Sequence, residues 1–465
     1  MVNRRFFAAA LLAGAVLRFI ALPLPGTRDV GVWKIWTYSA TRLGVTRLYG
    51  VGGSPPEHRV LDFHGAETTV DYPPLALYEL AVVGQVYRAS MHRQFPDTAL
   101  LTAAIKAALI LAEAGLAWLL FVAVRRAGSA DAARWAAAAY WLNPASIADA
   151  SVFAYLDPLF VLPAVGALVA AAWSAPVFAG AWLAVAALTK AQAVVIAPAV
   201  ALTVWNCGER ARAPARLART AAAWAATTAV IVAPIVFAGA GPNMIAALRS
   251  LTRHDMLSAN APNLWWVVGY VMRALYSLEL GVWNAFTAQT KILQISRVVS
   301  LGYPNPRTVG TVLTLAAFGW ALWTARRARD LWMATAVAAF LVHAYATLSA
   351  QVHENHLFAV VPLLAMAGAG RSRYRKLLFA VSAVFALNLN LFYGISEYID
   401  GWAIPRGLTI VDTTVVLAVT NCGLLVWHAR ILRGEARLAP PVVSDFPSQT
   451  PGQAVGHLRE LVSRP

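Results

Sequence analysis

The chain has 465 residues, of which 59% are hydrophobic and only 13% are charged, and its mean hydropathy is +0.59. Such a composition excludes a water-soluble globular protein and predicts a polytopic integral membrane protein. The formal net charge of +16 arises from basic residues that cluster between apolar segments, where they meet anionic lipid headgroups, so we expect no nucleic-acid partner.

The first apolar segment, residues 6–24, follows Arg4 and Arg5. Two arginines before an apolar stretch also begin secretory signal peptides, but no cleavage site of small residues precedes Pro25. The segment is long enough to span a bilayer. We therefore expect it to remain in the protein as the first transmembrane helix.

Apolar segments of this kind recur along the chain, each near the ~20 residues that a bilayer needs. They cover residues 6–24, 99–124, 132–148, 157–173, 175–189, 191–206, 220–239, 308–324, 331–349, 357–370, 377–394 and 407–427. The pattern predicts an all-α fold with about 12 transmembrane helices. Segments 157–173, 175–189 and 191–206 are short and closely joined, so one of them is a candidate for a broken or re-entrant helix.

Short clusters of basic residues occupy the connections between these segments and the ends of the chain. They are Arg4–Arg5, Arg125–Arg126, Arg210–Arg219, Arg326–Arg329, Arg371–Lys376 and Arg430–Arg437. Because basic residues in short loops stay on the cytoplasmic side, these clusters predict cytoplasmic N- and C-termini. The long loops, residues 25–98 and 240–307, then lie on the external side.

Both long loops contain amphipathic stretches. In the first loop, Val30–Leu48 carries Trp33 and Trp36 at positions that favour a membrane interface, and Leu75–Tyr87 forms a second such stretch. We predict two interfacial helices here. Residues 263–276 have the same character in the second loop.

The topology divides the chain into three parts. Residues 1–240 form an N-terminal transmembrane module that includes the first external loop, residues 25–98. Residues 241–437 form a C-terminal transmembrane module with the second long loop. Residues 438–465 are rich in proline, serine and charge, which predicts a disordered cytoplasmic tail.

Polar motifs converge on the external side of this topology. They are Arg28-Asp29, Asp71, Asn143-Pro144, Asp157, Lys190-Ala191-Gln192, Arg253-His254-Asp255, Asn260, Asn263 and Gln351–His356. The cytoplasmic loops hold basic residues and little else that could take part in a reaction. We therefore expect the chemistry of this protein on the external face, at helix ends and loops where lipid does not exclude charged groups.

Three of these motifs also have structural explanations. The prolines of Asp71-Tyr72-Pro73-Pro74 can end one helix and begin another, although this does not explain Asp71. Asn143-Pro144 can kink a membrane helix. Lys190 can extend to the membrane interface, as lysines near helix ends do, or it can bind a phosphate at the depth of the headgroups. The sequence leaves both roles of Lys190 open.

The sequence His353-Glu354-Asn355-His356 is one residue shorter than the His-Glu-x-x-His motif of zinc metalloproteases. Histidines at i and i+3 can share a helix face, so a metal site is a hypothesis, but no matching further ligand accompanies them. Cys207 and Cys422 are too differently placed for a thiolate metal site. Contacts with phosphate or sugar hydroxyl groups fit this motif better, and we expect no divalent metal or other cofactor.

Several motifs follow one another in a definite order along the chain. They are Asp29 with Trp33 and Trp36, Asp71-Tyr72-Pro73-Pro74-Leu75, Lys190-Ala191-Gln192 and Val352-His353-Glu354. In this order they resemble the polyprenyl-phosphate-sugar-dependent glycosyltransferases of the GT-C superfamily. The nearest resemblance is to the dolichyl-phosphate-glucose glucosyltransferases of N-glycan assembly and their bacterial mannosyltransferase-like relatives. Bacterial relatives often have Gly-Gln before an acid where this chain has Ala154-Tyr155-Leu156-Asp157, which leaves the role of Asp157 open.

The resemblance implies a GT-C type fold and a membrane glycosyltransferase that moves a hexose from a polyprenyl-phosphate-linked sugar to an acceptor. It implies that Asp29 is the catalytic base, with Asp71 as its rival. It also places Lys190, Gln192 and His353 near the donor phosphate. The remaining site candidates are Arg28, Asp157, Arg253, His254, Asp255, Glu354 and His356.

A polyprenyl-phosphate sugar also suits the layout of the chain, because its tail lies among helices, its phosphate at the headgroups and its sugar in water. A cation such as Lys190 or Arg253 would stabilise the departing phosphate, and a carboxylate would deprotonate the acceptor hydroxyl. Direct displacement with one base predicts inversion at the anomeric carbon. The expected partners are membrane lipids, the donor and a lipid-linked or glycan acceptor. The expected location is the plasma membrane, the bacterial inner membrane, with the active site facing the periplasm or exterior.

A polytopic transporter or lipid flippase is the alternative, because about twelve helices would also suit that class. Transporters place polar groups near the middle of the bilayer on broken helices, often in two related halves. No such halves are evident in this sequence, and its polar motifs gather on one face. The glycosyltransferase hypothesis is therefore favoured.

The predicted topology can be tested by chemical labelling. Single cysteines introduced next to Asp29 and next to Arg212, in a chain without Cys207 and Cys422, should react with a membrane-impermeant reagent from opposite sides of the membrane. The cysteine-free chain gives the background. Labelling of both positions from one side would contradict the topology and the single external face that depends on it.

Overall fold

The computed structural model describes residues 3–50, 60–90, 94–250, 254–280, 290–398, 406 and 412–438. This part of the chain is mainly helical, as predicted. Its strands are short: β1 (Leu61–Phe63) pairs antiparallel with β2 (Ala66–Thr68), and β3 (Ser258–Ala259) pairs parallel with β4 (Val352–His353). Of the predicted cytoplasmic tail, all residues after Leu438 lie outside the described part.

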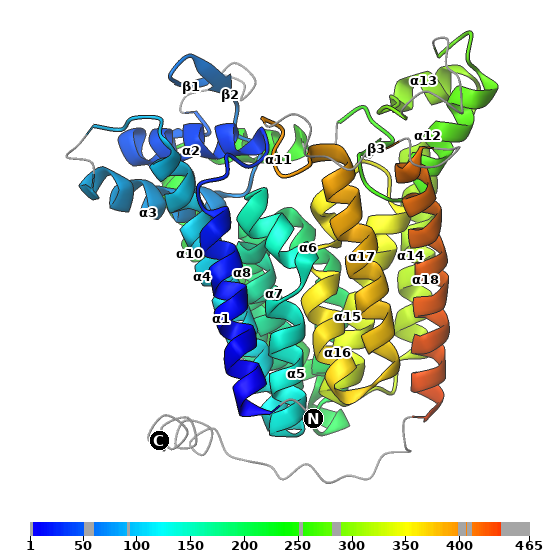
Figure 1. Cartoon of the computed structure of the whole chain (residues 1–465). Helices are drawn as coiled ribbons and strands as arrows, with labels where there is room; N and C mark the ends of the chain where they lie inside the picture. The colour runs from blue at the N-terminus through cyan, green and yellow to red at the C-terminus, as the bar shows by residue number, and fades with distance from the viewer. Residues whose placement is uncertain are drawn as a thin grey trace.

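Long helices lie side by side and form the body of the molecule (Figure 1). They are α1 (Arg4–Ala21), α4 (Ala99–Ala127), α5 (Ala130–Trp141), α7 (Asp157–Ala172), α8 (Pro176–Thr189), α9 (Ala197–Asn206), α10 (Ala213–Phe237), α14 (Pro306–Thr324), α15 (Leu331–Leu348), α16 (Val360–Gly370), α17 (Arg373–Tyr393) and α18 (Thr413–Leu438). Every apolar segment predicted from the sequence overlaps one of these helices.

Within the described residues, five helical segments are long and apolar enough to cross a membrane. They are Ala99–Ala127, Arg210–Phe237, Leu331–Leu348, Arg373–Tyr393 and Thr413–Leu438. The first of the remaining helices, α1, carries the three arginines Arg4, Arg5 and Arg18. The larger number of about 12 crossings stays a prediction.

Large apolar side chains cover the sides of this bundle. Phe19 on α1 is 73% exposed and Val230 on α10 is 74% exposed, and Leu12 and Leu315 are similarly accessible. Water-soluble proteins rarely expose apolar surface over so many neighbouring positions. These outward faces therefore suit contact with lipid, and the polar groups of the protein have to lie inside the bundle or at its ends.

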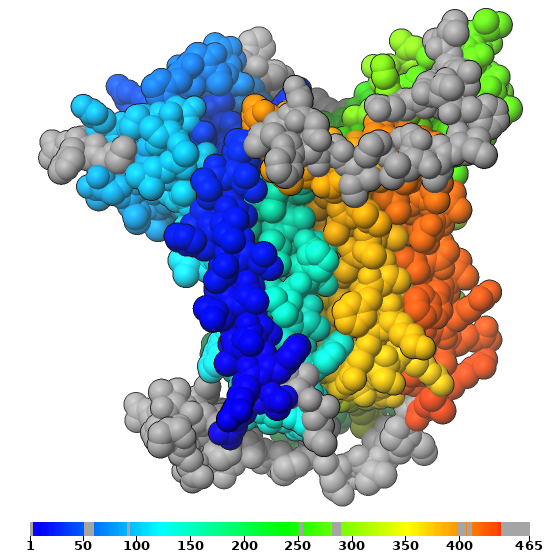
Figure 2. All heavy atoms as spheres, in the orientation of Figure 1, coloured from blue at the N-terminus to red at the C-terminus, as the bar shows by residue number. Residues whose placement is uncertain are grey.

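Shorter elements gather at one end of the bundle, the upper end in Figure 1. They include α2 (Asp29–Leu43), the 3₁₀ turn η1 (Val45–Arg47), α3 (Pro74–Ser90), α11 (Gly241–Ser250), α12 (Leu264–Leu275) and α13 (Ile295–Ser300). Figure 2 shows two separate masses above the bundle, one from the first long loop and one from the part of the second long loop that holds α12 and α13, whereas α11 packs against the first loop, where Asn243 Nδ2 donates to Gly50 O at 3.1 Å. The predicted stretches Val30–Leu48 and Leu75–Tyr87 are thus helical, with the first ending at Gly44, whose φ is +84°. Their position on a bilayer surface stays a prediction.

The basic clusters share the opposite end of the bundle, as predicted. Arg371 forms ion pairs with Asp330 at 3.0 Å and with Glu435 at 2.9 Å. Asn206 Nδ2 donates a hydrogen bond to Ala328 O at 2.9 Å. These contacts join the ends of α9, α16 and α18 to the connection between α14 and α15. The compartment that this end faces stays a prediction.

The helices are interrupted near the external end. After α5, Asn143-Pro144 begins the short helix α6 (Pro144–Ser146), which continues as the π-helical turn η3 (Ile147–Val152). Asn143 Oδ1 accepts from the Ala145 N–H at 3.0 Å, and Asn143 Nδ2 donates to Ser382 Oγ at 2.8 Å. The motif therefore breaks the helix and ties the break to α17. Insertions of this π type are frequent at functional sites.

A second interruption lies between the predicted segments 175–189 and 191–206. Helix α8 ends at Thr189, Lys190 is extended with φ −149° and ψ 126°, and the chain continues as the 3₁₀ turn η4 (Ala191–Ile196) before α9. Lys190 is only 3% exposed. The break thus directs a lysine inward, and the interpretation of Lys190 as an anchor in the membrane interface does not describe this conformation.

Buried polar side chains of α1 and α4 hold the start of the first external loop. Glu113 accepts hydrogen bonds from Arg18 Nη2 at 2.7 Å and from Arg18 Nε at 2.9 Å. Lys106 Nζ donates to the carbonyl oxygens of Ala21, Leu24 and Val152 at 2.6–3.1 Å. These bonds satisfy carbonyl groups freed at the end of α1 and in η3. The segment that leads to Asp29 is thereby fixed to the bundle.

Candidate functional site

Aromatic rings hold the two acids of the first external loop. Asp29 is the first residue of α2, and Asp71 lies just before α3. The ring centroids of Trp33, Trp36 and Tyr72 are 5.1 to 5.3 Å apart in all three pairs. Trp33 and Trp36 follow Asp29 at helical spacing, and Tyr72 follows Asp71 directly. Tilted and edge-to-face packing of these rings therefore fixes the segments of the two acids against each other.

Hydrogen bonds tie this aromatic cluster to the helix bundle. Trp33 Nε1 donates to Ala154 O at 3.1 Å, in the turn that precedes α7. Ala154 has φ +62°, a left-handed conformation that is uncommon for residues other than glycine. Tyr49 OH donates to Tyr72 O at 2.6 Å. The first external loop therefore packs against the N-terminal end of α7, which begins at Asp157.

A buried ion pair joins the end of α7 to the broken helix. Lys190 Nζ lies 2.9 Å from Asp157 Oδ1, and neither side chain is more than 4% exposed. Asp157 Oδ2 accepts a second hydrogen bond from Asn355 Nδ2 at 2.7 Å, in the 3₁₀ turn η7 (Glu354–Leu357). Loss of either charged partner would leave the other buried without compensation, so this pair holds three segments together.

Glu354, in the same turn, has a different set of partners. Tyr155 OH donates to Glu354 Oε1 at 2.5 Å. Burial raises the pKa of Glu354 to about 7, although the hydrogen bond from Tyr155 opposes the shift, and the charge of Asp29 adds to it. A carboxyl group with this pKa can hold or release a proton near neutral pH.

Gln192 and the histidines of the Val-His-Glu motif lie next to one another. Gln192 Nε2 is 2.6 Å from His356 Nε2, so the amide donates to the neutral ring. The His353 ring lies 5.7 Å from that of His356 and 6.2 Å from that of His254. Burial lowers the pKa of His353 to about 4, and the charge of Lys190 adds to this effect. His353 is therefore neutral at pH 7 and can donate a hydrogen bond to a phosphate without attracting it by charge.

Asp29 is accessible to solvent but closely surrounded by protein. Burial raises the pKa of Asp29 to about 6; the charge of Lys190 opposes the shift, and those of Glu397 and Asp71 add to it. Arg28, the site candidate next to Asp29, contacts another acid in the structure. The Arg28 N–H donates to Glu397 Oε2 at 2.6 Å, and its exposed guanidinium group lies 3.9 Å from the same oxygen. The cation that acts on Asp29 is Lys190.

Asp71, the second acid of the loop, is half-buried. Burial raises the pKa of Asp71, while the charge of His254 opposes the shift. Among the described residues no other side chain donates a hydrogen bond to its carboxylate. Asp71 therefore remains free to contact a substrate, as the rival of Asp29 as catalytic base.

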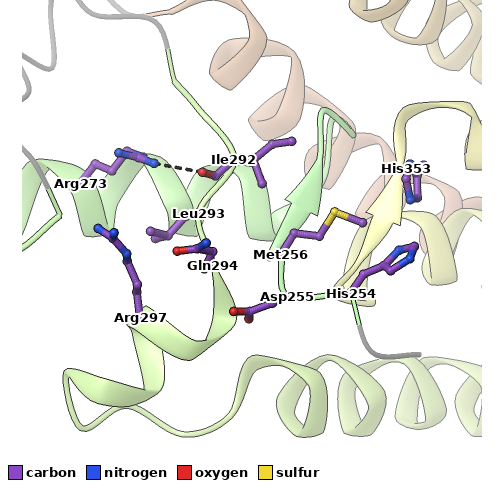
Figure 3. Close-up of a pocket in the computed structure, with 9 residues that line it drawn as sticks. All are labelled: His254, Asp255, Met256, Arg273, Ile292, Leu293, Gln294, Arg297 and His353. Carbon is purple, nitrogen blue, oxygen red and sulfur yellow. Dashed lines mark hydrogen bonds between the residues drawn. The ribbon is translucent and has the colours of Figure 1, made fainter. Parts of the chain in front are cut away.

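The Arg253-His254-Asp255 motif is only partly described, because Arg253 lies outside the described residues. His254 and Asp255 line a cavity of about 680 Å³ together with His353 (Figure 3). The Asp255 carboxylate accepts hydrogen bonds from the N–H and hydroxyl groups of Ser296 at 2.9 and 2.5 Å. These bonds lower the pKa of Asp255, which holds α13 in place rather than acting as a base.

Sequence reasoning missed several polar residues of this region. Asp149 in η3 is fully buried, and neither of its carboxylate oxygens has a hydrogen-bond partner among the described residues. Asp149 lies within the electrostatic influence of Asp157, Lys190 and Glu354. An acid between Ala148 and Ala150, directly after an apolar segment, was a detectable signal. Glu397 had no comparable signal, because only the fold brings it to Arg28.

The His353–His356 stretch forms the strand β4 and a 3₁₀ turn, not the α-helix that a zinc motif requires. In the described part of the chain, no group of three or more histidine, cysteine, aspartate or glutamate side chains is arranged to hold a metal ion. Whether the reaction needs a divalent cation stays a prediction, to be tested by its response to a chelator.

Comparison with known proteins adds one distant similarity. No family model matches the chain, and no curated protein does. A crystal structure of the Archaeoglobus fulgidus oligosaccharyltransferase, tethered with an acceptor peptide containing the NVT sequon, is similar with 13% sequence identity and a TM-score of 0.43. The match covers 94% of this chain and 55% of that one, so this chain spans about half the length of that protein. The function of this chain therefore has to be inferred from its own residues.

The raised pKa of Glu354 predicts a pH-dependent loss of stability. Between the ordinary value of 4.5 and about 7, the folded protein holds a proton that the unfolded chain has released, so the free energy of unfolding falls as pH rises through this window. Glu354→Gln cannot ionise. Thermal unfolding should therefore show this variant stabilised, relative to wild type, at about pH 8 and much less so at about pH 4.5.

The exposed residue Glu67, in β2, offers a matched control for this experiment. Glu67→Gln should leave the difference between the two pH values unchanged. An equal effect of Glu354→Gln at both pH values would mean that this carboxyl group ionises normally in the folded protein.

Proposed function

We propose that this protein is a membrane glycosyltransferase of the GT-C type that transfers a hexose from a polyprenyl-phosphate-linked sugar to an acceptor. One observation supports the proposal above all: Asp29, with a pKa raised to about 6, lies within the field of the buried Lys190–Asp157 pair at the end of an apolar helix bundle. A base that water can reach, next to a cation at the edge of an apolar region, is what a sugar on a lipid phosphate requires.

The surroundings of Lys190 support a site for a lipid phosphate. Gln192 and His356 line a small enclosed void of about 10 Å³ beside Asp157, with Val195 and Val342 on its apolar side, so a phosphate would have to displace these side chains to reach Lys190 from here. The polar side chains can donate hydrogen bonds to phosphate oxygens, and the apolar ones can contact the first part of a hydrocarbon tail. Lys190 supplies the positive charge that stabilises the phosphate as it leaves.

Asp29 is proposed as the general base. In the transfer step its carboxylate takes the proton of an acceptor hydroxyl, whose oxygen forms a bond to the anomeric carbon while the bond from that carbon to the phosphate oxygen breaks. The electron pair of that bond stays on the lipid phosphate, near Lys190. A pKa of about 6 leaves Asp29 ionised at neutral pH and makes it a stronger base than an ordinary aspartate. One displacement of this kind inverts the anomeric carbon.

The proposal needs no cofactor, because Lys190 supplies the charge that a metal ion would otherwise supply. The proposed partners of the protein are membrane lipids, the polyprenyl-phosphate sugar and a lipid-linked or glycan acceptor. The proposed location is the plasma membrane, the bacterial inner membrane, with Asp29 on the external side. We also propose that the chain divides into two transmembrane modules at residue 240.

Incubation of the purified protein with a panel of polyprenyl-phosphate sugars tests the activity directly. A glycosyltransferase releases free polyprenyl phosphate and forms a new glycoside. The alternative, a transporter or lipid flippase, would move the lipid between leaflets of a vesicle and leave the bond between sugar and phosphate intact. Translocation without release of the lipid phosphate would therefore favour the alternative.

Replacement of Asp29 tests its role as the base. Asp29→Asn keeps the shape but cannot accept the proton, so turnover should fall by ~10²–10⁴-fold while donor binding persists. In wild type the rate should rise with pH through about 6 and level off above it, because the base must be ionised, and the variant should lack this rise.

Asp71→Asn and Glu67→Gln serve as comparisons, the first for the rival acid and the second for an exposed acid of the same loop. Asp71→Asn should raise KM more than it lowers kcat, and Glu67→Gln should change neither. Near-normal turnover of Asp29→Asn with an inactive Asp71→Asn would reverse the assignment of the base. If Asp29→Asn and Asp71→Asn both remained active, neither acid of the first external loop would be the catalytic base.

Replacement of Lys190 separates its two roles, in the ion pair and at the donor phosphate. Lys190→Met alone leaves Asp157 buried without its partner and should cost about 3–5 kcal/mol of stability, because the remaining charge is uncompensated. The double variant Lys190→Met/Asp157→Asn removes both charges and should recover much of this stability. It should still bind the donor about tenfold or more weakly. Wild-type donor affinity in the double variant would show that Lys190 acts only in the ion pair.

A further inference from the structure

Two arginines line the cavity of about 680 Å³ in the second long loop (Figure 3). Arg273 projects from α12 and Arg297 from α13, and Figure 3 shows the guanidinium group of Arg297 directed towards that of Arg273. Gln294 also lines the cavity and adds a neutral polar group. The catalytic proposal uses neither arginine.

Neither guanidinium group is neutralised within the described part of the chain. No ion pair with a carboxylate includes Arg273 or Arg297. Arg273 donates to Ile292 O at 3.0 Å, but its buried Nε has no hydrogen-bond partner among the described residues. Burial lowers the pKa of Arg273, and the like charge of Arg297 adds to this effect. Two cations held close together without an acid favour the entry of an anion.

The acidic groups nearby do not neutralise the two arginines by direct contact. Asp255 lines the cavity, but both of its carboxylate oxygens already accept hydrogen bonds from Ser296. The sequence between α12 and α13 that lies outside the described residues, 281–289, contains no aspartate or glutamate. Glu279, also in this connection, forms no ion pair with either arginine, so no described carboxylate contacts the two guanidinium groups directly.

One wall of the cavity lies next to residues of the candidate active site. His254 and His353 form its wall on that side, and the His353 ring is 5.7 Å from that of His356, which contacts Gln192. The charge of His254 acts on Asp71. A molecule bound between the arginines could therefore reach past the histidines to the acids of the first external loop.

We propose that Arg273 and Arg297 form a binding site for a phosphate group. Two guanidinium forks match the charge and the several oxygens of a phosphate better than those of a single carboxylate. The phosphate can belong to the acceptor, an assignment that rests on the proposed glycosyl transfer, or to the headgroup of a membrane lipid. Leu275 and Leu278, at and just after the end of the helix that carries Arg273, are 68% and 88% exposed, so apolar groups are available on the same loop in either case.

Titration of inorganic phosphate into the full-length protein, held in nanodiscs of phosphatidylcholine, tests this site without any glycosyl transfer. Arg297→Gln is the main variant, because Arg297 is exposed and its replacement breaks no hydrogen bond described in the structure. It should bind phosphate roughly tenfold to a hundredfold more weakly than wild type. Arg88→Gln removes an exposed arginine from α3, at the same end of the bundle, and should bind phosphate like wild type.

The same phosphate titration in nanodiscs of equal parts phosphatidylcholine and phosphatidylglycerol distinguishes a lipid headgroup from the acceptor as the source of the phosphate. Weaker phosphate binding by wild type in these discs supports the site with a lipid headgroup as occupant, and unchanged binding supports the site with the acceptor as occupant. Equal binding by wild type and Arg297→Gln, or no binding in either type of disc, would overturn the proposal. Because glycosyl transfer is not measured, failure of the proposed function leaves this result unaffected.

Discussion

The external end of this protein depends on one buried positive charge. Lys190 is directed inward by the break between α8 and η4, and it stays charged there because Asp157 lies 2.9 Å away and Asn355 satisfies the remaining oxygen of that carboxylate. The same charge opposes the burial that raises the pKa of Asp29 and adds to the burial that keeps His353 neutral. A single ammonium group thus fixes three chain segments and sets the protonation of two candidate site residues.

Interrupted helices make this arrangement possible inside an apolar bundle. A continuous helix satisfies its own backbone and turns its side chains outward in a regular pattern, whereas a break frees backbone groups and redirects a side chain. At η3 the freed carbonyl of Val152 accepts from Lys106, and at the end of α1 the same ammonium group binds Ala21 and Leu24. The breaks therefore lie where polar side chains can satisfy them, which is also where the external loops begin.

The external end contains two differently charged regions joined by histidines. Around Asp29 and Asp71, acids with raised pKa values surround the ion pair, and water has access to the first of them. Around Arg273 and Arg297, no described carboxylate forms an ion pair with either guanidinium group. A base on one side and an anion site on the other would orient a substrate that carries both a hydroxyl group and a phosphate.

The sequence by itself determined the apolar segments, the helices α2 and α3, the broken helix near Lys190 and the gathering of polar motifs at one end. These features depend on local hydrophobic pattern, on proline and on the bilayer thickness, so neighbouring residues specify them. The tertiary structure alone decided which polar groups meet. Lys190 pairs with a residue 33 positions away, Tyr155 with one 199 away and Arg28 with Glu397, 369 away. Such pairings, and the burial that shifts each pKa, follow from the packing of distant helices, which no local pattern encodes.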